Sequence, residues 1–261
     1  MKNQKITISD IRATYSKEKM ALERRNKVWL YYVGRLPSFY LTWIFLHLNM
    51  SANQATSISV IVGLASCAFL ALGSYGAKLA GAIMATLFLT LDCVDGNIAR
   101  YRKSFSPFGE YIDALAGYVV TAFLYMSLGV GVFTNPNSSL LLTHPEGFFI
   151  SFNKEVFLIV GFWSSLSYVL ARLISLRYKT IVTSAPNNDT SRDVPPKRIF
   201  RIISILSRNI FDPGGLFMPL LLFAAIFKFL GLLTLCYGAV NSCALIVTIA
   251  KNTWKFFRAI K

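Results

Sequence analysis

The chain alternates between long apolar blocks and shorter polar segments. Apolar runs of roughly 20 residues recur along it, and helices of that length can cross a hydrocarbon core of about 30 Å. The pattern predicts six membrane-spanning helices, at residues 53–73, 78–100, 108–132, 155–177, 214–231 and 233–252. The predicted fold class is therefore all-α, a polytopic helical bundle in a membrane.

The apolar segment 28–48 is predicted to lie on the membrane and not across it. It contains Arg35 and Pro37, and the uninterrupted part after the proline is short for a span. We expect an N-terminal interfacial helix along the cytosolic face. The predicted organisation is a basic cytosolic or interfacial segment at 1–50, a six-helix transmembrane domain at 51–255 and a cytosolic tail at 256–261.

Composition agrees with a membrane protein. Hydrophobic residues make up 54% of the 261 residues and charged residues only 15%. A soluble domain carries about a quarter charged residues. The mean hydropathy is +0.51, so we expect an integral membrane protein with several spans.

The basic residues predict the orientation in the membrane. The formal net charge is +15, with nine Lys or Arg in residues 1–35, six in 178–213 and four in 251–261. Six spans place these three segments on one side, and cytosolic loops are rich in Lys and Arg. We therefore expect both termini in the cytosol and the loop 133–153 outside. Anionic membrane lipids, and not nucleic acid, are the expected partners of this basic surface.

An acidic cluster carries the candidate chemistry. Asp92 and Asp95 are spaced to share one helix face, and Asp113 lies about a turn into the next predicted span. The two spans are expected to be antiparallel neighbours, so that the three carboxylates converge at the cytosolic interface. Carboxylates at that depth are costly unless they pair or serve a function. They either pair with Arg100, Arg102 or Lys103, or bind Mg²⁺ or Mn²⁺, which prefer oxygen ligands.

Small and basic residues next to the carboxylates suit a phosphate ligand. Gly96 and Ala99 would allow a bulky group to approach the helix closely, or would serve helix packing. Arg100 would hold a phosphate or pair with a carboxylate. A metal beside a phosphate indicates metal-assisted phosphoryl transfer.

These residues resemble a known motif. The run from Asp92 to Arg100 reads D-x-x-D-G-x-x-A-R, and Gly109 and Asp113 follow as G-x-x-x-D. This pattern is similar to the defining motif of the CDP-alcohol phosphotransferase family. Asn53-x-x-Thr56 also resembles the element that opens the family's first span, and the resemblance covers roughly residues 36 to 252.

The resemblance implies an enzyme of phospholipid or related lipid metabolism. The family moves a substituted phosphate from a CDP-linked lipid or alcohol donor, such as CDP-diacylglycerol, to an alcohol acceptor and releases CMP. The domain 51–255 would then be catalytic, on the cytosolic face, and members usually form homodimers. The resemblance assigns metal binding to Asp92, Asp95 and Asp113, and a CDP pocket to Gly96, Ala99, Arg100 and Gly109, with Asn53 and Thr56 alongside.

One position departs from the family pattern. The fourth aspartate of the motif, usually a metal ligand and the proposed general base, falls at Gly117. Four explanations are open. Glu110 or a metal-bound water would take the role of the missing aspartate, or the second metal would be held by other ligands. Alternatively, a phosphorylated acceptor would need no general base, or the protein would not catalyse the transfer. We favour an active enzyme with an unusual acceptor, and take Asp113 and Glu110 as the catalytic candidates.

Two basic residues are candidates for binding the acceptor. Arg172 and Arg177 end the fourth predicted span and would hold an acceptor phosphate, or extend to lipid headgroups.

A cation-coupled transporter is the more distant alternative, because the later spans carry no matching acidic residues for a path through the midplane. A non-catalytic homologue that binds CDP-lipid is the other alternative, and Gly117 is its support.

Overall fold

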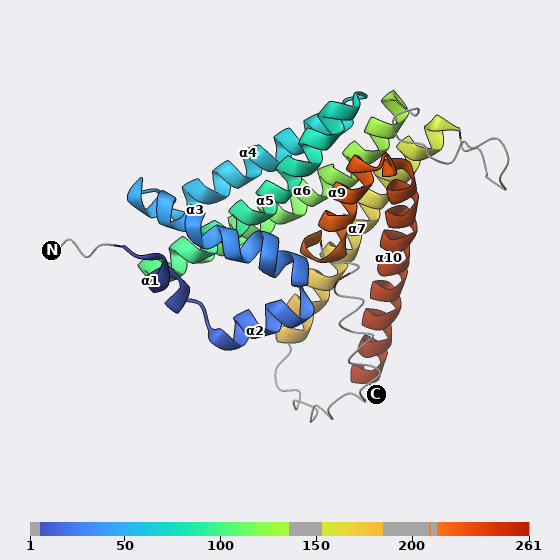
Figure 1. The fold of residues 1–261 in the computed structure, drawn as a ribbon. Helices are drawn as coiled ribbons and strands as arrows, with labels where there is room; N and C mark the ends of the chain where they lie inside the picture. The colour runs from blue at the N-terminus through green and yellow to red at the C-terminus, as the bar shows by residue number, and fades with distance from the viewer. Residues whose placement is uncertain (1–5, 136–152, 185–208, 210–212, 261) are drawn as a thin grey trace.

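The computed structural model describes residues 6–135, 153–184, 209 and 213–260, and every regular element in these residues is a helix (Figure 1). This confirms the all-α class. The elements are α1 (Ile8–Ala13), α2 (Lys17–Asn26), η1 (Leu30–Arg35), α3 (Leu36–His47), α4 (Ala52–Ala71), α5 (Tyr75–Arg102), α6 (Pro107–Thr134), α7 (Lys154–Ser184), η3 (Pro213–Phe217), α9 (Met218–Ile226) and α10 (Leu230–Ile260), of which η1 and η3 are π-helical turns.

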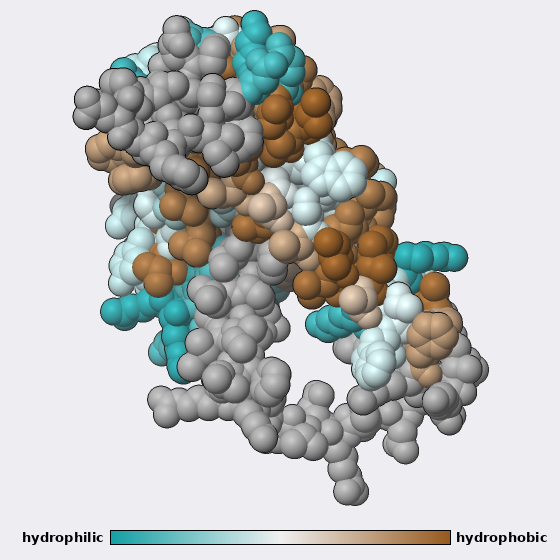
Figure 2. Space-filling model, turned by 90° about the vertical axis from the view of Figure 1, so that its right-hand side faces the viewer, coloured by the Kyte–Doolittle hydropathy of each residue, from teal (hydrophilic) through white to brown (hydrophobic). Residues whose placement is uncertain are grey.

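Five helices in the described residues are long and apolar enough to cross a membrane. They are α4, α5, α6, the Lys154–Tyr178 part of α7 and the Leu230–Trp254 part of α10. Five of the predicted spans are thereby confirmed as such helices, and the protein is a multi-pass integral membrane protein. Apolar side chains such as Ile61, Ile159 and Ile246 are exposed on the outside of the helices. Figure 2 shows apolar residues over the middle of one face, with the most hydrophilic residues towards its ends.

The predicted span 214–231 is not confirmed. Its place is taken by η3 and α9, and the apolar helix Gly214–Ile226 has fewer than 18 residues. At about 1.5 Å per residue, such a helix is shorter than a hydrocarbon core of about 30 Å. The chain turns at Lys228, which has a left-handed φ of 64°, and α10 begins two residues later. The continuous apolar run in the sequence therefore contains a turn.

The apolar segment 28–48 forms η1 followed by α3, and not one regular helix. Pro37 lies in the first turn of α3, where a proline is tolerated. In Figure 1, α1, α2 and α3 lie at the end of the bundle where α5 ends and α6 begins. Through α3 and η1 this N-terminal segment packs against α5. The predicted loops 133–153 and 178–213 lie largely outside the described residues.

Hydroxyl side chains cap the helices at this end of the bundle. Ser51 and Gln54 form a reciprocal capping box at the start of α4. Ser106 caps α6, with Pro107 in its first turn. Lys103 ends α5 in the left-handed conformation, with φ of 52°. The caps form hydrogen bonds with backbone groups that have no partner within the helix at its ends. The chain can therefore pass from α5 to α6 through a short connection.

The helix α4 holds the bundle together around this end. It packs along both α5 and α6, whereas α5 and α6 contact each other at few positions. The expected neighbours α5 and α6 thus contact each other directly at few positions, and α4 packs against both of them. The helices α6, α7 and α10 complete the bundle around a buried aromatic core that includes Tyr125, Phe157 and Tyr237.

Close contact between α6 and α7 depends on two glycines, Gly129 and Gly161. A Cβ added at Gly129 would lie 2.5 Å from the carbonyl oxygen of Phe157 and 2.9 Å from the Cα of Gly161. Both atoms belong to the backbone and cannot move aside, and small residues commonly allow helix backbones to approach in membranes. The two helices would therefore have to separate for a larger residue.

We expect Gly129→Ala to lower the thermal denaturation midpoint of the purified protein by about 5 °C, the equivalent of about 2 kcal/mol of overpacking. Gly76→Ala is the matched control, because a Cβ there meets nothing within 4 Å, and its midpoint should stay at the wild-type value. Equal midpoints for the two variants would show that the contact does not matter for stability.

Candidate active site

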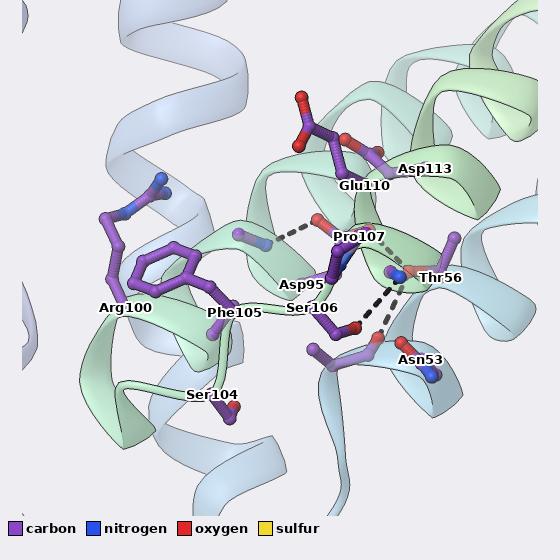
Figure 3. Close-up of a pocket in the computed structure, with 14 residues that line it drawn as sticks. Asn53, Thr56, Asp95, Arg100, Ser104, Phe105, Ser106, Pro107, Glu110 and Asp113 are labelled. Atoms are coloured by element: carbon purple, nitrogen blue, oxygen red, sulfur yellow. Dashed lines mark hydrogen bonds between the residues drawn. The ribbon is translucent and has the colours of Figure 1, made fainter.

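A cavity of about 460 Å³ opens at the end of the bundle where α5 ends and α6 begins (Figure 3). Three segments form it: the start of α4, the last turns of α5 with the loop that follows, and the start of α6. The lining residues are Ala52, Asn53, Thr56, Asp95, Gly96, Ala99, Arg100, Ser104, Phe105, Ser106, Pro107, Gly109, Glu110 and Asp113. Nine of the residues singled out from the sequence are thus together in one cavity.

Asp95 is the buried carboxylate of the cavity, with 5% of its surface exposed. The hydroxyl of Thr56 on α4 donates a hydrogen bond of 2.6 Å to its Oδ2, and the backbone N–H of Gly96 donates to its Oδ1. Two donors to one carboxylate fix its orientation. The role of Thr56 is therefore visible in the structure: it joins α4 to the carboxylate on α5.

The other acidic residues are placed unequally. Glu110 and Asp113 are one turn apart on α6 and both line the cavity, on the wall opposite α5 in Figure 3. Asp92 is half-buried on α5 and is not among the lining residues. Within the described residues, no group of three His, Cys, Asp or Glu side chains is close enough to hold a metal ion. The expected convergence of all three aspartates on one point is therefore not seen.

Arg100 extends along the wall of the cavity that α5 forms. Its Nη2 donates a hydrogen bond of 2.9 Å to the Oδ1 of Asn97. The guanidinium also lies against Gly96, where an added Cβ would be 3.1 Å from Nη2. A glycine at position 96 thus allows the guanidinium to lie close to the helix backbone.

Gly109 and Asn53 both line the cavity and lie next to each other. The N–H of Gly109 donates to the Oγ of the capping Ser106, and an added Cβ at 109 would lie 3.4 Å from the Oδ1 of Asn53. The start of α6 therefore sits close against the start of α4. Ala99 completes the wall next to Arg100.

The residues predicted for the acceptor do not line this cavity. Arg172 is half-buried, with its guanidinium carbon 5.3 Å from the ring centroid of Tyr168 and 6.0 Å from that of Tyr118. Arg177 is exposed.

Sequence reasoning missed two groups of residues. The first is the loop after α5, where Ser104 and Phe105 line the cavity; the exposed aromatic ring within the motif's spacer was its only signal. The second is an N-terminal network behind Arg100, made of Tyr15, Glu23 and Arg35. Nothing in the local pattern links these residues to α5, because their contacts depend on how the N-terminal helices pack.

The charges of this network follow from burial and pairing. Burial, together with a hydrogen bond to the Glu23 carboxylate, raises the pKa of Tyr15 to about 12. Burial also opposes ionisation of Glu23, but hydrogen bonds from Arg35 and Tyr15 outweigh it and hold the pKa of Glu23 below its ordinary value. Near pH 7 the phenol is therefore neutral and the carboxylate is ionised.

The fold and the cavity define the class of protein: a multi-pass α-helical membrane protein with carboxylates and an arginine around one cavity at the end of the bundle. The sequence model of the CDP-alcohol phosphatidyltransferase family matches residues 49–250, and the chain belongs to that family. Its members are transferases of substituted phosphate groups and act in phospholipid biosynthesis. Among curated proteins no match was found.

Proposed function

We propose that the protein transfers a substituted phosphate from a CDP-linked donor, such as CDP-diacylglycerol, to an alcohol-type acceptor and releases CMP. The observation that carries the proposal is the single cavity shared by Asp95, Asp113, Gly96, Arg100 and Gly109. These residues come from both halves of the motif, and the cavity gathers an arginine for phosphate and oxygen ligands for a cation.

The oxygen ligands fit a divalent metal by their chemistry. Asp95 and Asp113, with Asp92 as the predicted third ligand, would hold Mg²⁺ or Mn²⁺, which prefer carboxylate oxygen. When bound, the metal would offset the charge of the diphosphate and of the leaving CMP. We expect a chelator to abolish turnover and added Mg²⁺ or Mn²⁺ to restore it.

The proposed reaction is a displacement at phosphorus. The acceptor oxygen forms a bond to the phosphorus atom that carries the alcohol or lipid substituent. The bond from that phosphorus to the oxygen bridging it to CMP breaks, and CMP leaves with the electron pair. Arg100 would hold the diphosphate by charge-assisted hydrogen bonds. Gly96 and Ala99 would allow the nucleotide to lie against α5.

A hydroxyl acceptor also has to lose a proton, and we assign that proton to the Glu110 carboxylate. Glu110 lines the cavity one turn from Asp113. Gly117 stands where the family motif has its fourth aspartate, so that carboxylate is missing from this chain. A carboxylate within reach of the acceptor oxygen is what a general base requires. A phosphorylated acceptor, being already ionised, would not need it.

The proposal also includes an orientation in the membrane, contacts to the acceptor and an oligomeric state. The basic segments, taken with the six predicted spans, would put the cavity and both termini on the cytosolic face. Arg172 and Arg177 would contact a phosphorylated acceptor, and the protein would form a homodimer, as family members usually do. A non-catalytic homologue that binds the CDP-linked donor is the alternative that Gly117 favours.

The test is CMP release by the purified full-length chain in lipid. CDP-diacylglycerol is offered with a panel of alcohols and phosphorylated alcohols, with and without Mg²⁺ or Mn²⁺, and binding of CDP is measured in parallel. We expect CMP release that needs both the metal and one class of acceptor. Donor binding without release across the panel would favour the non-catalytic homologue, and absence of cytidine nucleotide binding would contradict the proposal.

A further inference from the structure

The cavity-lining residues of the described chain include one cation, Arg100. Its guanidinium is largely enclosed, and its Nε is buried without a hydrogen-bond partner. A flexible arginine side chain has many rotamers to lose when it binds a phosphate, so neighbours that hold it in advance increase affinity. The residues around Arg100 therefore bear on how well the cavity binds a diphosphate.

Tyr15, in the turn between α1 and α2, is one of those neighbours. It is buried, with 7% of its surface exposed. The guanidinium carbon of Arg100 lies 4.8 Å from its ring centroid, and that of Arg35 lies 4.5 Å from it. Both distances are within the range of cation–π attraction, which strengthens when the groups are removed from water.

The ring of Tyr15 is itself held by an ion pair. Its hydroxyl donates a 2.6 Å hydrogen bond to Oε1 of Glu23. Glu23 in turn accepts hydrogen bonds of 3.0 Å from the Nε and from Nη2 of Arg35. The carboxylate offsets the charge of Arg35, so a single aromatic ring can contact two guanidinium groups.

Asn97 holds Arg100 from a second direction. Its Oδ1 accepts a hydrogen bond from Nη2 of Arg100. The same oxygen accepts a longer hydrogen bond, of 3.5 Å, from Nη1 of Arg35. Its amide group donates to the hydroxyls of Ser38 and Thr42 on α3, at 2.9 and 3.2 Å. The orientation of Arg100 is thus linked to helices that precede the family match, which begins at residue 49.

We propose that Tyr15 is a positioning residue that holds Arg100 in the orientation that binds the diphosphate of the CDP-linked donor. This inference rests on the proposed function. It gives the N-terminal segment a role in the site: the turn between α1 and α2 carries the ring, and α2 carries the carboxylate, that support a motif residue on α5.

The competing explanation is that Tyr15 serves packing alone. Its ring also belongs to a buried cluster with Ile11 and Phe39, and it contacts Phe39 edge to face. Loss of the ring would then lower stability without acting through Arg100. A double-mutant cycle separates the two explanations, since only residues that act through one another give non-additive effects.

The experiment measures CDP binding, with Mg²⁺ present, to the purified full-length chain in lipid. We expect Tyr15→Leu to weaken binding about tenfold, the loss of one buried cation–π contact. Tyr15→Phe retains the ring and should stay within about twofold of wild type. In the Arg100→Gln background, which has no cation at position 100, Tyr15→Leu should have an effect of less than about twofold. In turnover the loss should appear in KM for the donor more than in kcat.

The matched control is Tyr40→Leu on α3, which removes a ring 5.8 Å from the guanidinium of Arg12 and should leave CDP affinity unchanged. Tyr15→Met, which keeps more volume, replaces Tyr15→Leu if that variant does not fold. An equal effect of the substitution in the wild-type and Arg100→Gln backgrounds would overturn the proposal, as would a lowered denaturation midpoint with unchanged CDP affinity. Failure of the wild-type chain to bind CDP would instead contradict the proposed function on which the inference rests.

Discussion

Asp95→Asn is expected to reduce the rate of CMP release by a factor on the order of 100 to 1,000. The substitution keeps the size of the side chain but removes the charge. The amide would also present an N–H₂ group to one of the two donors that Asp95 now accepts from, Thr56 and the N–H of Gly96. The buried site would lose both a proposed metal ligand and a satisfied hydrogen bond.

The measurement is kcat at saturating donor, over a series of Mg²⁺ concentrations. Asp10→Asn is the matched control, since Asp10 is an exposed capping residue of α1 and should leave kcat unchanged. Wild-type kcat and wild-type metal dependence in Asp95→Asn would remove this carboxylate from the proposed mechanism.

The second prediction with a large expected effect concerns Glu110, the proposed general base. Glu110→Gln is expected to lower kcat with a hydroxyl acceptor by about 100-fold or more, the usual contribution of such a base. Gly117→Asp in the same background should recover at least about tenfold of that loss, by restoring a carboxylate two turns further along α6 than Glu110. The new side chain would fit, because a Cβ at position 117 meets nothing within 4 Å.

Gly117→Asn in the Glu110→Gln background is the control for this rescue. It has the size of aspartate without the charge, so recovery by both substitutions would exclude a carboxylate effect. Wild-type kcat in Glu110→Gln, with a phosphorylated acceptor as the reactive one, would show that the acceptor arrives ionised and that no base is needed.

The sequence anticipated much of the cavity because the motif is local. Residues 92 to 100 lie on one helix, and helix geometry alone places Asp95, Gly96, Ala99 and Arg100 within two turns of each other. The short connection to α6 then brings Gly109, Glu110 and Asp113 to the same end of the bundle. Asn53 and Thr56 were found only through their resemblance to a family element, and the structure gives Thr56 a contact, the hydrogen bond to Asp95.

Packing between helices distant in sequence was less predictable. The sequence suggested that α5 and α6 are antiparallel neighbours, but it gave no sign that α4 packs along both of them. Asp92 shares a helix face with Asp95 by spacing, yet it does not line the cavity. A spacing of three residues leaves an angular offset and a rise along the axis, so a small cavity can admit one side chain and not the other.

By itself, the sequence determined that the protein is an α-helical membrane protein of the CDP-alcohol family and where its motif lies, because hydrophobic length, charge bias and helix spacing are all local properties. Only the tertiary structure showed that a turn at Lys228 follows the short apolar helix Gly214–Ile226, and that Tyr15 and Arg35, joined through Glu23, contact Arg100 and Asn97 on α5. Those contacts join residues 62 to 85 positions apart. They depend on the packing of the N-terminal helices against α5, which no local pattern encodes.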